Sequence, residues 1–114
     1  MFKVLIHHNG RLASPMCNHP YTPHQPTPYR PRTASRIYRN TTTGYHLFHH
    51  AHDALAYAAA ENVSLAANTT SLVFHAHGFG NPIHDRFNWD ARGLTATTAV
   101  FTSVTVTTPY TGNA

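Results

Sequence analysis

The chain has 114 residues, of which 41% are hydrophobic and only 11% are charged, with eight basic residues against four acidic ones. A chain of this length builds one modest hydrophobic core, so we expect a single domain over residues 1–114. The formal charge of +4 favours acidic surfaces or nucleic acid as partners. The longest apolar run, ALAYAAA, is far below the roughly 20 residues that a membrane-spanning helix needs, so we expect no membrane association.

The N-terminal segment MFKVLIHHNG alternates apolar and polar residues before Asn9 and Gly10. Asn-Gly tolerates the positive backbone angles of a tight turn, so the pattern predicts a hairpin with strands at about 2–8 and 11–14. The apolar run is too short for a secretory signal, and no small-residue cleavage site follows it. Cys17 has no second cysteine to pair with, so no disulfide within the chain is expected.

The composition changes after this hairpin, because residues 15–31 hold six of the eight prolines. Proline lacks an amide donor and favours extended backbone, which predicts a Pro-rich extended arm or long loop over residues 15–32. Half of all basic residues follow within ten positions, interleaved with tyrosines. Arginine forms planar, bidentate contacts with carboxylate and phosphate groups. The expected binding residues are therefore Tyr29, Arg30, Arg32, Arg36, Tyr38 and Arg39.

The stretch GYHLFHHAHDALAYAAAEN predicts a short strand at 45–48 and a helix at about 51–61. Small or apolar residues fall at i, i+3, i+4 and i+7 on one helical face, formed by Ala51, Ala54, Leu55 and Ala58. Four histidines and an aspartate crowd the junction between strand and helix: His46, His49, His50, His52 and Asp53. Helical zinc sites place two histidines at i and i+4 with a glutamate between them, and that pair is absent here. We interpret the junction as a solvated surface.

The segment SLVFHAHG predicts a strand with Leu72, Phe74 and Ala76 on one face and Val73, His75 and His77 on the other. Two histidines at i and i+2 project together, and His84 follows after a short loop. These three histidines are the alternative metal site, but no glutamate or cysteine completes a ligand set. We expect neither a metal nor another cofactor.

The C-terminal third predicts a loop over residues 78–93 and then β structure. Phe87 and Trp89 are the expected anchors of that loop, which glycines and a proline punctuate. Beyond it, apolar residues at even positions alternate with threonine and serine, typical of a long edge strand, or of two strands joined near Thr97 and Thr98. The expected fold is α+β, a mostly antiparallel sheet with one main helix and the Pro-rich arm.

The order of KVL, GRLASP and GYHLFHHAHDALAYA, followed by an apolar strand and a closing β segment, resembles a family of small phage and bacterial α+β proteins of unknown function. The resemblance covers about two thirds of the chain, and 44–58 is its most specific part. It implies a compact α+β domain of unknown function. We separately expect a phage-encoded component of a larger assembly, held through the Pro/Arg-rich arm and located in a virion or in the host cytoplasm. The Pro-rich segment and its arginines are not part of that pattern.

A second, fainter similarity links the strand and helix around 45–58 to a motif of ADP-ribosyltransferases. It implies that His7 or His8 holds the nicotinamide ribose of NAD, that Tyr45 or Tyr57 stacks on the nicotinamide, and that a late strand supplies a catalytic glutamate. Glu61 is the only glutamate, and it falls at the end of the predicted helix, where it cannot polarise the ribose hydroxyl.

Other catalytic constellations are also missing from the sequence. Four carboxylates give little material for paired acid–base work, and a nucleophile elbow and a phosphate-binding glycine loop are absent. Cys17 and His19 lie in the Pro-rich segment, a poor place to hold a nucleophile and its base rigidly. We therefore expect a non-catalytic binding or assembly protein with protein partners, a second copy of the chain or a polyanion among them. A small inhibitor of a host target and an NAD-using transferase are the alternatives.

Overall fold

A computed structural model describes residues 1–15, 19–29, 44–62, 65–89 and 94–111, without the side chains of residues 85, 87–89 and 94. Within these ranges one helix accompanies a mostly antiparallel sheet, which confirms the expected α+β class. The elements are β1 (Phe2–His8), β2 (Arg11–Ala13), β3 (Pro20–Tyr21), β4 (Thr27–Pro28), β5 (Tyr45–Phe48), α1 (Ala51–Asn62), β6 (Thr69–Phe79), β7 (Ile83–Trp89), β8 (Leu94–Phe101) and β9 (Ser103–Pro109).

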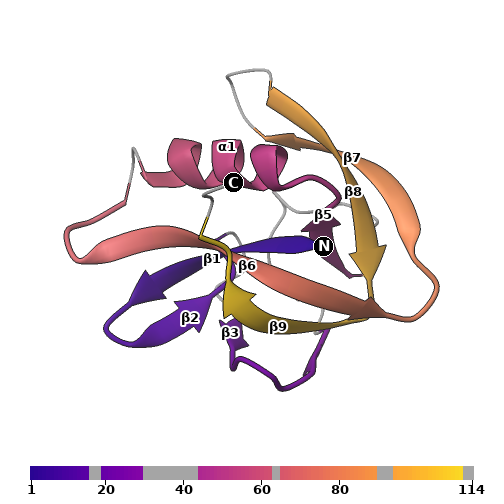
Figure 1. The fold of residues 1–114 in the computed structure, drawn as a ribbon, viewed down its shortest axis with the longest axis horizontal. Coiled ribbons are helices and arrows are strands. Elements are labelled where there is room, and N and C mark those ends of the chain that lie inside the picture. Colours follow the sequence, from indigo (N-terminus) through magenta and orange to yellow (C-terminus); the bar gives the residue numbers. More distant parts are fainter. Residues whose placement is uncertain (16–18, 30–43, 63–64, 90–93, 112–114) are drawn as a thin grey trace, which may run out of the picture.

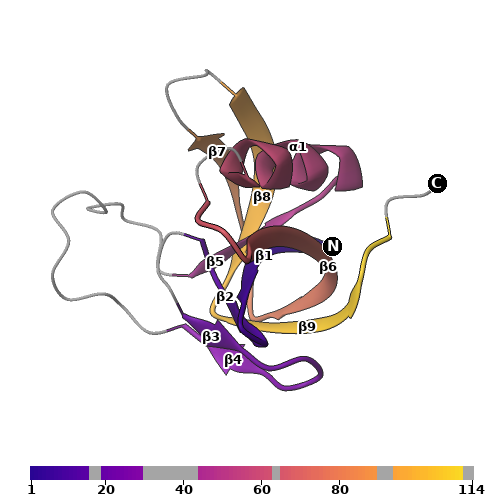
Figure 2. The same ribbon diagram turned by 90° about the vertical axis from the view of Figure 1, so that its left-hand side faces the viewer.

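The strands follow the order β4-β9-β6-β1-β5-β8-β7, and β2 joins β1 and β3 beside this path. Strand β1 is central, since it pairs antiparallel with β2, β5 and β6. Helix α1 packs on β6, β1 and β5 and covers one face of the sheet (Figure 1). Strands β3 and β4 lie on the opposite side from the helix (Figure 2).

The sheet is strongly curled, because β8 and β9 are separated by Thr102 alone yet pair with strands far apart in the sheet order. Strand β8 pairs with β5 and β7, whereas β9 pairs with β4 and β6. At the corner the ring of Phe101 lies directly on the backbone of Gly78 in β6, where a Cβ atom would come within 2.1 Å of the ring. Glycine at position 78 thus permits the close approach that the curl requires.

Two hydrophobic cores lie on the two faces of this sheet. The concave core, inside the curl, comprises Leu5, Tyr21, Tyr45, Leu47, Phe74, Ala76, Ala99, Phe101, Val104 and Val106. The helix-side core, between the sheet and α1, comprises Val4, Phe48, Ala54, Tyr57, Ala58, Val73 and Ala96. Successive residues of a strand point to opposite faces, so β1, β5, β6 and β8 each contribute to both cores.

The N-terminal hairpin, the strand at 45–48 and the helix confirm the sequence expectations. Asn9 and Gly10 have φ values of 50° and 76°, as the tight turn requires. The helix differs in its buried face, which consists of Ala54, Tyr57 and Ala58, while Leu55 is 39% exposed. Tyr57, about one turn beyond Ala54, packs against the sheet, so the face of the helix that contains Leu55 is turned toward solvent. In the described part of the chain, no helix is both long enough and apolar enough to cross a membrane.

The C-terminal third departs from the expected loop and edge strand. Residues 83–89 form strand β7 rather than part of a loop, and it pairs with β8 along its whole length. The break in the closing β segment is at Thr102, not near Thr97 and Thr98, and both flanking strands are interior. The turn is confined to residues 80–82, which include Gly80 and Pro82. The residues that follow have the composition of a loop, but their pairing with β8 makes them a strand.

The expected Pro-rich arm or loop is not confirmed as a free arm, because the described residues 19–29 pack against the body of the protein. Backbone amides of His24 and Tyr29 donate to the carbonyls of Val106 (2.7 Å) and Thr102 (2.8 Å). Tyr21 is 4% exposed within the concave core. Prolines are tolerated because β3 and β4 are two-residue strands at the margin of the sheet, where few amide donors are needed. Residues 16–18 and 30–32 of the predicted arm lie outside the described residues.

Candidate functional site

The described residues on either side of residues 30–43 meet on the side of the sheet away from α1. The ring of Tyr29 contacts the ring of Tyr45 edge-on, with 5.2 Å between centroids. The Tyr45 hydroxyl donates to the carbonyl of Pro28 at 3.4 Å. Tyr29 is further fixed by the hydrogen bond that its backbone amide donates to the carbonyl of Thr102. The arginine-bearing segment, residues 29–39, is therefore flanked in the sequence by residues that meet at one place on the body of the protein.

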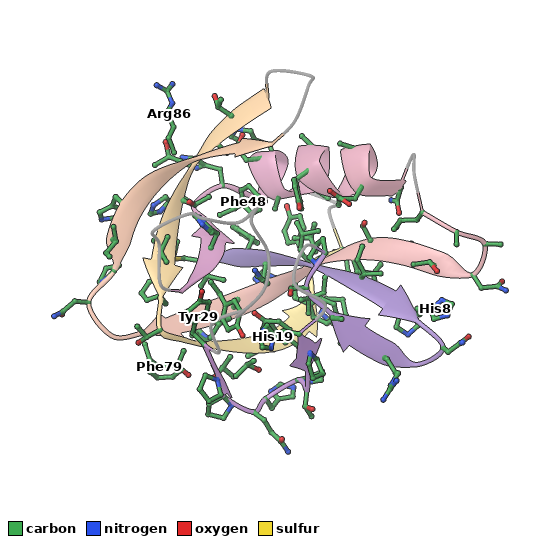
Figure 3. All side chains as sticks on the ribbon, turned by 180° about the vertical axis from the view of Figure 1, so that it is seen from behind. His8, His19, Tyr29, Phe48, Phe79 and Arg86 are labelled. Atoms are coloured by element: carbon green, nitrogen blue, oxygen red, sulfur yellow. The ribbon has the colours of Figure 1, made fainter. Side chains whose placement is uncertain are left out.

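Tyr45 is the centre of an aromatic cluster that forms this attachment. His19 and Tyr21 pack on it with ring centroids at 5.5 and 5.7 Å. Figure 3 shows His19 and Tyr29 close to each other and Phe48 on the side of the helix. These contacts join β5 to the Pro-rich residues on either side of β3 and β4. Aromatic rings provide a large apolar contact area. The rings of this cluster therefore hold the Pro-rich residues, which have little regular secondary structure, against β5.

Lys3, the one lysine of the chain, is buried beside the same cluster. Its Nζ atom lies 5.6 Å from the Tyr45 ring centroid and 5.9 Å from that of Tyr21, within the range of cation–π attraction. The ammonium also donates to the carbonyl of His46 at 3.3 Å. Lys3 therefore links β1 to β5 behind the base of the arginine-bearing segment.

Of the six binding residues expected from the sequence, the structure describes Tyr29 alone. Arg30, Arg32, Arg36, Tyr38 and Arg39 lie outside the described residues. Tyr29 is partly buried against Tyr45. We therefore interpret it as a residue that positions the segment and not as one whose ring contacts a partner. Sequence reasoning missed Lys3, Tyr21 and Tyr45 as its supports. The sequence did contain a sign that Lys3 is buried. Lys3 lies two residues before Leu5 in β1, so both side chains point to the same face of the sheet.

The alternative metal site is not formed by the described residues. His75 contacts the rings of Phe2 and Tyr110, with centroids at 5.5 Å in both cases. His84 instead stacks on His49, with centroids 5.4 Å apart and 21° between the planes. Within the described ranges no three histidine, cysteine, aspartate or glutamate side chains are grouped to hold a metal ion. Strand β7 takes His84 to the far end of the sheet from β6, which separates it from His75 and His77.

The residues expected for an NAD site are also kept apart. Tyr45 belongs to the concave core and Tyr57 to the helix-side core, so the two rings lie on opposite faces of the sheet. His7 and His8 end β1 beside Thr70 and Thr69, whereas the start of β1 pairs with β5. Figure 3 places His8 at the tip of the β1–β2 hairpin. Glu61 lies in the last turn of α1, which covers the face of the sheet opposite to Tyr45.

The histidines around the start of α1 form a surface cluster from three elements. His49 and His50 connect β5 to the helix, His52 is in its first turn, and His84 comes from β7. The rings of His50 and His52 are stacked with centroids 5.3 Å apart, and His52 Nε2 lies 3.4 Å from Asp53 Oδ1. Burial lowers the pKa of His49, and the positive charges that His84 and His50 can carry lower it further.

No family model matches this sequence, and comparisons with curated proteins and with solved structures found no similar protein. The resemblance to small phage and bacterial proteins therefore rests on the residues of this chain alone.

Proposed function

We propose that this protein is a non-catalytic binding protein that contacts an anionic surface of its partner through the arginine-bearing segment, residues 29–39. The observation that carries the proposal is the closed base of this segment, where Tyr29 and Pro28 meet Tyr45. A component of a larger assembly, such as a phage virion, is the role that best suits a small chain with this feature.

Charge supports an anionic partner. Residues 1–52 contain six of the eight basic residues and none of the four acidic ones. Of these six, Lys3 is buried in the aromatic cluster and Arg11 is exposed on β2, which leaves four arginines in the segment itself. Like charges so close in sequence attract polyanions and repel one another, so the segment gains most from a partner that neutralises it.

The contacts of Pro28 and Tyr29 with Tyr45 support a high affinity of the arginine-bearing segment for its partner. A free arm must lose the freedom of its whole length on binding, whereas a loop with fixed ends has already lost part of it. The edge-on ring contact and the two hydrogen bonds of Pro28 and Tyr29 supply that fixation. The arginines are thereby presented together from one site on the protein, which increases the chance that several contact the same partner.

The test is a salt titration of binding to two defined probes, a single-stranded DNA oligonucleotide and a polyglutamate peptide, followed by fluorescence anisotropy. Each arginine that no longer neutralises a phosphate should reduce the slope of log K against log salt by about 0.7 for single-stranded DNA. The variant Arg30→Ser/Arg32→Ser should therefore bind more weakly and lower this slope by about 1.4. Preference for one probe identifies the class of partner, nucleic acid or acidic protein.

A matched control has the same net charge as the Arg30→Ser/Arg32→Ser variant. Arg11 and Arg86 are exposed on β2 and β7, so Arg11→Ser/Arg86→Ser removes two positive charges elsewhere. It should leave the slope nearly unchanged. Tyr29→Ala, which removes no charge, should weaken binding several-fold by freeing one end of the segment. Equal effects of the two double variants, or a salt-independent affinity, would show that the arginines are only a solvated surface.

A further inference from the structure

The contact between His49 and His84 joins two elements that are far apart in the sequence. His49 follows β5 and precedes α1, and His84 is the second residue of β7. Their rings are nearly parallel, at 21°, with centroids 5.4 Å apart. His84 pairs across the sheet with Ala99 of β8, which in turn pairs with Leu47 of β5, so β8 lies between the strand that carries His84 and the strand that His49 follows. The contact thus bridges over β8.

We propose that His49 and His84 form a pH-sensitive contact that holds β7 against the β5–α1 junction at neutral pH and loosens β7 on acidification. Two neutral imidazoles stack favourably, because ring packing buries apolar surface without a charge penalty. Two imidazolium rings at this separation repel each other, and the partly buried His49 also loses solvation when it is charged. The proposal is independent of the arginine-bearing segment and of its partner.

Among the side chains that the structure describes, the surroundings add more positive than negative charge. His50 precedes α1 and His52 lies in its first turn, His46 on β5 binds Thr98 Oγ1 at 2.9 Å, and the N-terminal ammonium of Met1 acts on His49. Arg86, two residues along β7, points away from the body of the protein (Figure 3). The carboxylates whose side chains are described are Asp53 and Glu61, and Asp53 faces His52 at 3.4 Å. Acidification therefore accumulates charge of one sign here.

The direction of the pH effect follows from the lowered pKa of His49. In the unfolded chain histidine titrates near 6.5, and in the folded protein His49 binds its proton only at lower pH. The stabilising contact is therefore complete above about pH 6.5 and is lost as the pH falls through the folded pKa of His49.

Strand β7 is the element that can respond, because it ends the order of described strands and pairs with β8 alone. An edge strand opens locally at a lower free energy than an interior strand such as β5 or β8. Its first residue, Ile83, is 55% exposed and adds little burial to hold it. Loosening β7 would expose the β8 edge, a surface to which another chain can add a strand.

The experiment is amide hydrogen exchange by NMR at about pH 7.5 and about pH 5.0 in EDTA, a range in which histidine changes charge. Protection factors of β7 amides are compared with those of β5, which serve as the internal reference. Between the two pH values, β7 protection should fall relative to that of β5, because the contact is lost as His49 takes up its proton. The variant His84→Gln should reduce this pH dependence, since only the burial of His49 and its other charged neighbours remain to cause it, whereas His77→Gln, an exposed histidine on β6, should retain it in full.

A second readout does not depend on the stability of β7. The ring resonances of His49 should titrate at a higher pH in His84→Gln than in the unchanged protein, because one source of repulsion is gone. The proposal is overturned if β7 protection relative to β5 is the same at both pH values. It is equally overturned if His84→Gln leaves the pH dependence or the His49 titration unchanged.

Discussion

The concave core and the helix-side core share β1, β5, β6 and β8 but differ in what surrounds them. The helix-side core is closed by α1, a single element that can shift as a unit. The concave core is closed by strands that continue into one another around the corner at Thr102, with β3 and β4 below. It also contains the ring of Phe101, packed on the backbone of Gly78, and it adjoins the buried side chain of Lys3.

Because of this difference, the proposed binding segment depends on the concave side of the sheet. Tyr45, the centre of the aromatic cluster, belongs to the concave core, and the arginine-bearing segment is attached there. The helix-side core uses small residues, Ala54 and Ala58, to bring α1 close to the sheet. We expect mutations on the two sides to differ in size and in kind, and the predictions below test this from the largest effect to the smallest.

The largest expected effects come from two adjacent residues that point into different cores, Leu47 and Phe48, which are 0% and 3% exposed. Leu47→Ala leaves a cavity enclosed by strands that cannot collapse, so we expect a loss of about 4–5 kcal/mol in the free energy of unfolding. Phe48→Ala removes a larger ring, but α1 can move toward the space, so we expect about 3–4 kcal/mol. Urea unfolding of both variants measures this. If Phe48→Ala is clearly the more costly, the two cores do not differ in rigidity.

Gly78→Ala should have the next largest effect. Its Cβ would lie within 2.1–2.4 Å of three atoms of the Phe101 ring, so either the ring or the corner must move. We expect a loss of about 2–3 kcal/mol from overpacking. The double variant Gly78→Ala/Phe101→Leu should lose less than the sum of the two single variants, because leucine vacates part of that space. His77→Ala, at the exposed neighbouring position, is the control. Additive losses in the double-mutant cycle would contradict the contact.

Lys3→Met should change stability by less than about 1 kcal/mol, because relief of the buried charge offsets the loss of the cation–π attraction. Methionine keeps the length and apolar stem of the side chain within the Tyr21 and Tyr45 contacts. Thermal unfolding measures the stability, and the anionic probes measure binding. Unchanged stability with weakened binding would instead add Lys3 to the binding residues, and a large loss of stability would show that the ammonium holds β5 in place.

The smallest effect is the contribution of His49 to stability below neutral pH. Its lowered pKa means that the folded protein resists its protonation, so its contribution declines as the pH falls below about 6.5. The difference in free energy of unfolding between the unchanged protein and His49→Gln should therefore shift in favour of the variant on acidification. Urea titrations at several pH values measure it. A difference that is constant with pH would mean that His49 is fully solvated.

Local patterns were sufficient for the elements with strong short-range signals. Asn9-Gly10 predicted the hairpin, alternation predicted β1 and β6, and the i, i+3, i+4 spacing predicted α1. The signal failed where a partner strand decides the outcome. Strand β7 has the composition of a loop, yet each of its residues pairs with β8. The arginines define the proposed binding segment in the sequence, but its attachment to Tyr45 depends on β5, which follows it in the chain.

The sequence by itself determined the single domain, the helix, most strands and the concentration of positive charge before residue 53, because these depend on composition and on neighbours within one or two turns. Tertiary structure alone decided the corner at Thr102, the fit of Phe101 on Gly78, and the packing of Tyr21, Tyr29 and Lys3 around Tyr45. It also brought His84 to His49 rather than to His75 and His77. Each of these contacts joins residues far apart in the chain, and sheet order, which alternation does not encode, decides which of them meet.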